Sequence, residues 1–251
     1  MIKNNKRYLL ALFVAVVSIQ ACSNDDDKLP VPEPEPEEPE FLQISDHIKR
    51  YRNGVIEISN YLVDTTKSNA NAYDFYSIKD TSFVTDDKNA ELVKTDAWDF
   101  CFQGLWRQQL YPNNGKMQTQ SRPWYGNSTN ALITMVKTSF DDLTTVPSDI
   151  KFPELTDGYY PQNYVIPDVP DNNYQIYWAS RSYTEAGDFA YFIPLIDRCY
   201  IFKLDDGRYV KFQFVNIYNN APEENTISSK RGYVSFRYFV SEKGSLDLST
   251  K

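Results

Sequence analysis

Residues 199–218 read CYIFKLDDGRYVKFQFVNIY, and this stretch decides the fold class. Two runs rich in β-branched and aromatic residues flank Asp206 and Gly207, and such runs are typical of β-strands. The Asp-Gly pair tolerates the positive φ angles that a tight hairpin turn requires. The stretch therefore predicts an antiparallel hairpin whose strands cover residues 199–204 and 208–218.

A third strand of the same kind follows this hairpin. Residues 232–240 read GYVSFRYFV and come after a polar stretch at residues 219–231. Three consecutive antiparallel strands form a β-meander. Alternating or apolar runs upstream predict further strands at residues 55–63, 72–78, 96–103 and 131–138. We therefore expect an all-β, predominantly antiparallel fold that ends in a β-meander.

Two of the upstream segments carry more detailed expectations. The alternation in residues 96–103 places Trp98, Phe100 and Phe102 on one face of a strand. The other face then carries Asp99, Cys101 and Gln103. The pattern also allows a short helix over residues 44–51, with Ser45 as its N-cap.

Two long connections separate the predicted strands. Residues 111–130 and 146–171 are rich in Pro, Asn, Asp and Tyr. Loops of this length in a single domain tend to be functional or disordered. Because these two are also rich in aromatic residues, we expect partly ordered loops on a strand framework.

The first 21 residues are typical of a signal peptide. Lys3, Lys6 and Arg7 precede an apolar run at residues 9–17, which is too short to span a membrane. The run leads into Ser-Ile-Gln-Ala-Cys, which resembles the cleavage box of bacterial lipoproteins and ends at Cys22. We expect Cys22 to be the lipidated first residue of the mature chain, and the alternative is an ordinary signal peptide with a chance Cys.

Residues 22–40 are expected to form a tether ahead of a domain at residues 41–251. Three consecutive Asp residues, 25–27, resemble the surface-export signal of Bacteroidota lipoproteins, and the alternative is a solvated linker. Pro alternates with Glu over residues 30–40, which favours an extended chain of about 34 Å. We expect a lipoprotein of the outer membrane that is exposed at the cell surface.

The amino-acid composition argues against several classes of function. With 26 Lys and Arg against 34 Asp and Glu, the net charge of −8 argues against nucleic-acid binding. A single His argues against His-rich metal centres and most Ser-His-Asp triads. The chain also lacks the CxxC, HExxH, phosphate-loop and nucleophile-elbow motifs, so we do not expect an enzyme.

Two Cys residues remain once Cys22 is lipidated. Cys101 and Cys199 both fall in predicted strands. An exported protein can form disulfides, and buried thiols in strands are equally compatible with the sequence. Both interpretations stay open.

Three of the strand motifs together resemble the HmuY-like lipoproteins of Bacteroidota. The first motif is Trp-Asp-Phe-Cys-Phe at residues 98–102. The second is the hairpin in which a Tyr-led apolar strand, a Gly turn and Tyr-Val-Lys-Phe follow one another over residues 200–212. The third is Gly-Tyr-Val-Ser-Phe-Arg-Tyr at residues 232–238. The order, the spacing and the lipoprotein start agree with that family over most of residues 45–241.

The resemblance implies a single all-β domain that binds haem. Members of this family take haem from host haemoproteins and pass it to an outer-membrane receptor, as part of iron acquisition. Two axial side chains, His in some members and Met in others, hold the iron from loops between the Trp strand and the C-terminal hairpin.

The present sequence departs from that ligand pattern. It has no Met or His after Met135, and His47 lies before the Trp strand, where we interpret it as exposed or capping. Met117, in a polar loop, and Met135, in a predicted strand, remain as candidate haem ligands. Core packing is the alternative role for Met135.

Tyrosines offer a second set of candidates in the region where the family places its ligands. A phenolate can bind ferric haem, and several Tyr rings can also line a flat apolar pocket. The candidates are Tyr159, Tyr160, Tyr164, Tyr177 and Tyr183. For each one, packing or a surface hydrogen bond is the alternative role. The alternative function is the same scaffold without haem ligation, binding another tetrapyrrole, a glycan or a protein, or serving as a structural surface protein.

Overall fold

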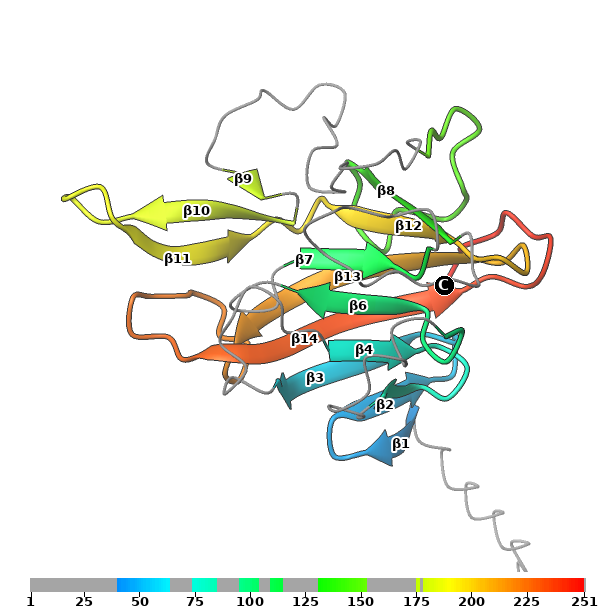
Figure 1. The fold of residues 1–251 in the computed structure, drawn as a ribbon, viewed down its shortest axis with the longest axis horizontal. Helices are drawn as coiled ribbons and strands as arrows, with labels where there is room; N and C mark the ends of the chain where they lie inside the picture. Colours follow the sequence, from blue (N-terminus) through cyan, green and yellow to red (C-terminus); the bar gives the residue numbers. More distant parts are fainter. Residues whose placement is uncertain are drawn as a thin grey trace, which may run out of the picture. The chain divides into compact units, whose positions relative to one another are not determined.

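A computed structural model of the chain describes residues 40–63, 74–84, 95–103, 109–114, 131–152, 175–176 and 178–250. These residues form fourteen β-strands and no helix (Figure 1). The chain divides into two units, residues 1–38 and 39–251, and every described residue belongs to the second. The all-β, antiparallel fold class predicted from the sequence is confirmed.

The largest element is an antiparallel sheet of seven strands (Figure 1). In spatial order they are β1 (Phe41–Ser45), β2 (Ile48–Tyr51), β3 (Ile56–Leu62), β14 (Arg231–Val240), β13 (Tyr209–Tyr218), β12 (Cys199–Lys203) and β8 (Leu132–Val136). The predicted hairpin is β12 and β13, and β14 completes the meander. Gly207 turns between β12 and β13 with a φ of 87°, a conformation that glycine adopts at little cost.

Two smaller antiparallel sheets complete the fold. The four-stranded sheet contains β5 (Ser82–Val84), β4 (Asp74–Ser77), β6 (Phe100–Gln103) and β7 (Gln109–Pro112). The three-stranded sheet contains β11 (Phe189–Pro194), β10 (Ala179–Tyr183) and β9 (Gln175–Ile176). The hydroxyl of Tyr218, at the end of β13, accepts a 2.9 Å hydrogen bond from the Phe192 N–H and ties β11 to the large sheet.

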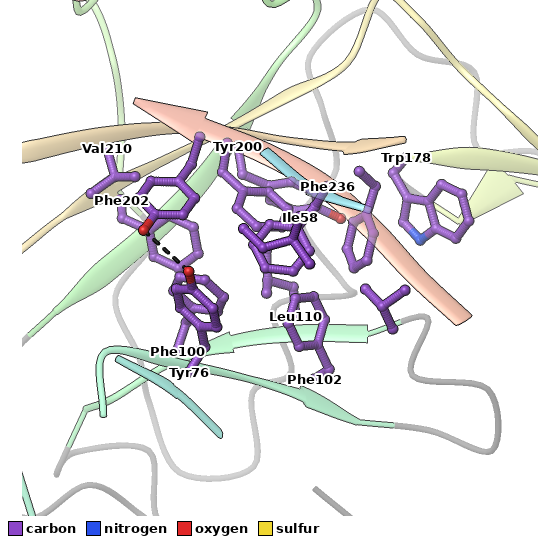
Figure 2. Close-up of a cluster of buried hydrophobic side chains, with 14 of the residues drawn as sticks. Ile58, Tyr76, Phe100, Phe102, Leu110, Trp178, Tyr200, Phe202, Val210 and Phe236 are labelled. Atoms are coloured by element: carbon purple, nitrogen blue, oxygen red, sulfur yellow. Dashed lines mark hydrogen bonds between the residues drawn. The ribbon is translucent and has the colours of Figure 1, made fainter. Parts of the chain in front are cut away.

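The main core lies between the four-stranded sheet and one face of the large sheet (Figure 2). Phe100 and Phe102 of β6 are fully buried and contact rings of β13 and β14. The ring centres of Phe102 and Phe236 lie 5.1 Å apart, and those of Phe212 and Phe236 lie 5.0 Å apart in a stack. This aromatic layer carries much of the hydrophobic stabilisation, since each ring removes a large apolar area from water.

The expected helix over residues 44–51 is wrong. This segment forms the hairpin of β1 and β2, and Ile48 of β2 pairs with Ile58 of β3. Ile48 is buried by that pairing. The local sequence could not show this, because the strand partner that decides the conformation comes later in the chain.

The predicted face of Trp98 is also wrong. The strand begins only at Phe100, and the Trp98 ring packs against Phe75 with a centroid distance of 4.9 Å. Phe75 pairs with Cys101, so it belongs to the face opposite Phe100 and Phe102. The carboxylate of Asp99, just before the strand begins, accepts a 2.6 Å hydrogen bond from the N–H of Ile78, which lies 21 residues earlier in the chain.

The other face of the large sheet, here called the outer face, is covered in part by chain without regular strands. Residues 139–152 and 245–250 cross it side by side, joined by the Val146 N–H to Leu246 O and Leu248 N–H to Thr144 O hydrogen bonds. Phe140, Leu143, Val146 and Leu248 form a second core there with Cys199 and Ile201 of β12. The rest of the outer face carries the groove described below.

Candidate binding site on the outer sheet face

A row of polar side chains crosses the outer face where the covering segments end. The strand register places Lys49 of β2 beside Glu57 of β3, Glu57 beside Arg237 of β14, and Arg237 beside Gln213 of β13. Directly opposed residues on antiparallel strands point to the same face. The row therefore alternates in charge and ends in an amide.

Arg237 is held at the centre of this row by three contacts. Its Nε donates a 3.0 Å hydrogen bond to Gln213 Oε1, and its Nη2 lies 3.3 Å from Asp141 Oδ2. Its guanidinium carbon lies 4.3 Å from the centre of the Phe140 ring. Gln213 is anchored in turn, because its Nε2 donates to Ile196 O at 3.0 Å. The guanidinium is thus neutralised and fixed in position.

Glu57 is satisfied in a similar way. Its Oε2 accepts a 3.1 Å hydrogen bond from the Tyr51 hydroxyl, and its Oε1 accepts one of 2.9 Å from the Ser59 hydroxyl. Burial, followed by the neighbouring Glu57 carboxylate, raises the pKa of Tyr51, so this phenol remains a donor at neutral pH. Glu57 and Arg237 therefore both find hydrogen-bonding partners within the protein.

A groove of about 780 Å³ opens over this part of the outer face. Its floor is formed by β3, β14 and β13, which lie side by side in Figure 1. Ser139 and Asp141 line one wall, and the chain around Ile196 and Asn220 lines others. A volume of this size lies within the range of small-molecule sites in proteins.

The rim of the groove is conformationally strained. Four non-glycine residues among the described ones have positive φ, and three of them line the groove: Asn60 at 54°, Asn220 at 60° and Ala221 at 39°. Asn60 and Asn220 hold each other through the Asn220 N–H to Asn60 Oδ1 bond of 2.7 Å and the Asn60 Nδ2 to Asn220 Oδ1 bond of 3.1 Å. Such strain persists only where surrounding structure enforces it, and it concentrates at functional sites.

The sheet itself is irregular beneath this rim. The register of β14 shifts against β3 between Val234 and Phe236, and against β13 it shifts between Phe214 and Asn216. The Ser235 hydroxyl accepts the Asn60 N–H at 2.9 Å, so the bulged strands are joined at this point. Bulges re-aim side chains and are common beside binding sites.

A second cation lies beside the groove but is closed off from it. Lys211 of β13 has 0% exposure, and its Nζ donates to Phe140 O at 2.9 Å, Leu143 O at 3.1 Å and Thr250 Oγ1 at 3.2 Å. Burial lowers the pKa of Lys211 to about 8 and raises the pKa of the neighbouring Cys199 thiol to about 12. Lys211 fastens the covering segments and is not available to a ligand.

The structure places two of the candidate haem ligands. Met135 lies in β8, is 7% exposed, and pairs with Tyr200 inside the main core, so its thioether packs among apolar side chains. Tyr183 ends β10 and is exposed, with its ring edge against Phe189 at a centroid distance of 6.4 Å. Met135 therefore has the core-packing environment expected of its alternative role, and the role predicted for Tyr183 stays a prediction.

The single histidine is also placed. His47 lies in the turn between β1 and β2, where its Nδ1 hydrogen-bonds Ser59 O at 3.1 Å and its ring meets Tyr61 edge-on. The expectation of an exposed or capping histidine is close, since the ring is half-buried and bonds a backbone carbonyl. Among the described residues, no cluster of three or more His, Cys, Asp or Glu side chains could hold a metal ion.

The remaining candidates lie outside the described residues. They are Cys22, Met117, Tyr159, Tyr160, Tyr164 and Tyr177. Their predicted roles stay predictions. Within the part of the chain that the structure describes, no helix has the length and apolar character to cross a membrane.

The question about the other two cysteines is answered. Cys101 and Cys199 are both buried, and no disulfide joins them. Cys101 lies on the far face of the four-stranded sheet, beside Phe75, whereas Cys199 belongs to the core on the outer face of the large sheet. The two thiols therefore serve separate cores.

Sequence reasoning missed the groove entirely. Three members of the polar row line it, on β3, β14 and β13, and no local motif marks them because β3 lies far from the other two strands in the sequence. One weak signal exists, because Asn219-Asn220-Ala221-Pro222 is typical of a tight turn with residues at positive φ.

Comparison with known proteins gives similarity to solved structures only. No protein-family model matches the sequence, and no curated protein matches it either. The similar structures include the apo form of a HmuY analogue from Tannerella forsythia, at 14% identity, a TM-score of 0.44, and coverage of 75% of this chain and 97% of that one.

Two further structures come from Bacteroides. A Bacteroides vulgatus protein provisionally called HmuY-like and haem-binding has 13% identity and a TM-score of 0.41, over 74% of this chain and 92% of its own. A Bacteroides fragilis protein provisionally called a lipoprotein has 17% identity and a TM-score of 0.42, over 79% and 95% respectively. HmuY-like proteins, the family that the sequence motifs resemble, are thus among the structures similar to this chain.

Proposed function

We propose that this chain is an exported lipoprotein that binds haem and does not act as an enzyme. Lipid on Cys22 anchors it to the outer membrane, and residues 22–40 hold the β domain away from the lipid surface, where it meets host haemoproteins and a membrane receptor. The signal peptide, the cleavage box and the Pro-Glu tether support the anchoring half of this proposal.

One structural observation supports the family resemblance on which the haem-binding half rests. The three segments that resemble the HmuY-like family form adjoining parts of one core: β6 packs against β13 and β14, and β12 pairs with β13. Phe100 of β6 also contacts Phe202 of β12 at a centroid distance of 5.4 Å. The motifs are therefore a consistent framework, as expected if the resemblance extends to the whole domain.

The described residues bear on which side chains could coordinate the haem iron. Met135 does not support an axial role because it packs in the main core, whereas Tyr183 is exposed at the end of β10 and stays a candidate. Met117 and the tyrosines at 159, 160, 164 and 177 remain with it as the proposed ligands. When bound, haem would supply an iron centre that a thioether or phenolate can coordinate.

Haemin titration of the full chain in lipid nanodiscs tests the proposal. We expect a sharp Soret shift that saturates at one equivalent, measured against empty nanodiscs because haem also partitions into lipid. A Met117→Ala variant should change the spectrum of the bound, reduced form if the thioether is a ligand. Met135→Leu is the matched control, since it keeps the core volume and should leave the spectrum unchanged.

The outcomes separate the alternatives. A broad, non-saturating change would contradict haem binding. Saturable binding with an unchanged spectrum in Met117→Ala would remove Met ligation and leave the tyrosines, to be replaced singly by Phe. An altered spectrum in Met135→Leu would show that our reading of Met135 as a core residue is wrong.

A further inference from the structure

We propose that the groove on the outer face of the large sheet binds a neutral oligosaccharide. This is a second site, separate from the proposed haem ligands, and it does not depend on haem binding. Its floor consists of β3, β14 and β13, and its strained rim contains Asn60, Asn220 and Ala221.

The groove is a built feature of the sheet. Three of the four non-glycine positive-φ residues in the described chain gather on its rim. Reciprocal hydrogen bonds between Asn60 and Asn220 and the bulge at Ser235 hold them there. Holding L-residues at positive φ costs stability, and in this protein three such residues are concentrated on the rim of the groove.

The charges in the groove argue against an ionic ligand. Arg237 is occupied by Gln213 and Asp141, and Glu57 is occupied by Tyr51 and Ser59. A phosphate, a sulfated chain or an acidic peptide would have to break these pairs before meeting a cation. A ligand without charge meets no such obstacle.

The floor argues against an added peptide strand. A peptide that extends a sheet needs unpaired backbone groups at an edge strand. Here β3, β14 and β13 are interior strands of the sheet, and β14, at the centre of the floor, is paired with β3 on one side and with β13 on the other. A ligand in the groove meets side chains rather than a strand edge.

The remaining surface matches a sugar. Val215 and Ile196 present exposed aliphatic groups, and Ile196 is 81% exposed. Asn220 also lines the groove, and its Nδ2 takes no part in the paired hydrogen bonds with Asn60. A pyranose ring likewise combines an apolar C–H face with hydroxyls that both donate and accept hydrogen bonds. Aliphatic side chains can cover the ring face while amide and hydroxyl groups bind its edge.

Saturation-transfer NMR on the full chain in lipid nanodiscs tests this inference. The neutral probes are maltohexaose, chitohexaose and mannopentaose at millimolar concentration, and a heparin hexasaccharide is the charged probe. We expect saturable binding of at least one neutral probe and none of heparin. Val215→Trp narrows the groove over its floor and should weaken binding, and Ile196→Ala should weaken it about fivefold.

Ile227→Ala is the matched control, because Ile227 is 64% exposed and does not line the groove. It should bind the same probe with unchanged affinity. Failure of all three neutral probes, preference for heparin, or unchanged binding in Val215→Trp would overturn the inference. Haemin titration of folded Val215→Trp should match that of the unmodified chain, so that the failure of one proposal remains distinguishable from failure of the other.

Discussion

The two faces of the seven-stranded sheet are built from the same strands but differ in chemistry. On β13 the inner face presents Val210, Phe212 and Phe214 to the main core. The outer face of the same strand presents Lys211, Gln213 and Val215. Lys211 and Gln213 are nonetheless buried, so the difference is not simply one between core and solvent.

The nature of the cover explains the difference. The inner face is covered by another sheet, whose backbone groups pair within that sheet, so only apolar side chains are needed against it. The outer face is covered by irregular chain, whose carbonyls have no strand partner. Lys211 donates to the carbonyls of Phe140 and Leu143, and Gln213 donates to that of Ile196. In this sheet, the face covered by irregular chain therefore carries hydrogen-bond donors for the carbonyls of that chain. The face covered by another sheet carries aromatic side chains instead.

The largest effect should come from the inner face. Phe100→Ala removes a fully buried ring that contacts Tyr76, Phe202 and Phe212, and we expect it to lower the free energy of unfolding by about 3–5 kcal/mol. Urea unfolding followed by tryptophan fluorescence measures this. Leu42→Ala on exposed β1 is the control and should change stability by less than about 0.5 kcal/mol. A similar loss in both variants would contradict the assignment of the core.

A smaller effect should come from the buried Lys211 on the outer face, and it should appear in how stability depends on pH. Between pH 8 and 9 the folded chain releases the Lys211 proton, whereas the unfolded chain keeps it, because burial lowers the pKa of Lys211 from 10.5 to about 8. The unfolded state then binds more protons, so stability should rise by up to about 1.4 kcal/mol per pH unit.

Above pH 9 the Cys199 thiol acts in the opposite direction, since its pKa rises from 9.0 to about 12 on folding and the unfolded chain loses that proton first. The unmodified chain should therefore level off there. The midpoints of urea unfolding, measured at a series of pH values from 8 to above 9, show both the rise and the levelling off. Lys211→Met should lack the rise between pH 8 and 9, and a rise of equal size in that variant would refute the role given to Lys211.

The smallest effect should come from the groove rim. Ala221 has a φ of 39°, so Ala221→Gly relieves strain and should raise the free energy of unfolding by up to about 1 kcal/mol. The same substitution at buried Ala190 of β11, where φ is not positive, should instead lower it by roughly 0.5–1 kcal/mol. Thermal unfolding of the two variants gives the comparison, and a loss of stability at both sites would mean that the rim is not strained.

Local sequence was sufficient for half of the strands, β3, β4, β6, β8, β12, β13 and β14. The Asp-Gly hairpin, the meander and the strands near residues 55–63 and 131–138 follow from β-branched and aromatic runs and from turn chemistry, which act over a few residues. It failed where a distant partner decides the conformation. The β1–β2 hairpin depends on pairing with β3, and next to Trp98 the Asp99 carboxylate contacts Ile78, which lies 21 residues earlier in the chain.

Within the regular strands, away from the bulges, the sequence by itself determined which side chains share a face, because alternation is a property of the extended chain. Only the tertiary structure decided which faces are covered and by what. Lys211 and Gln213 read as solvent-facing residues until residues 139–152 and 194–196 are laid across them. The groove likewise exists only because the covering segments end before they reach β3 and the bulged part of β14. Contacts between segments that lie far apart in the chain decide where the covering segments end.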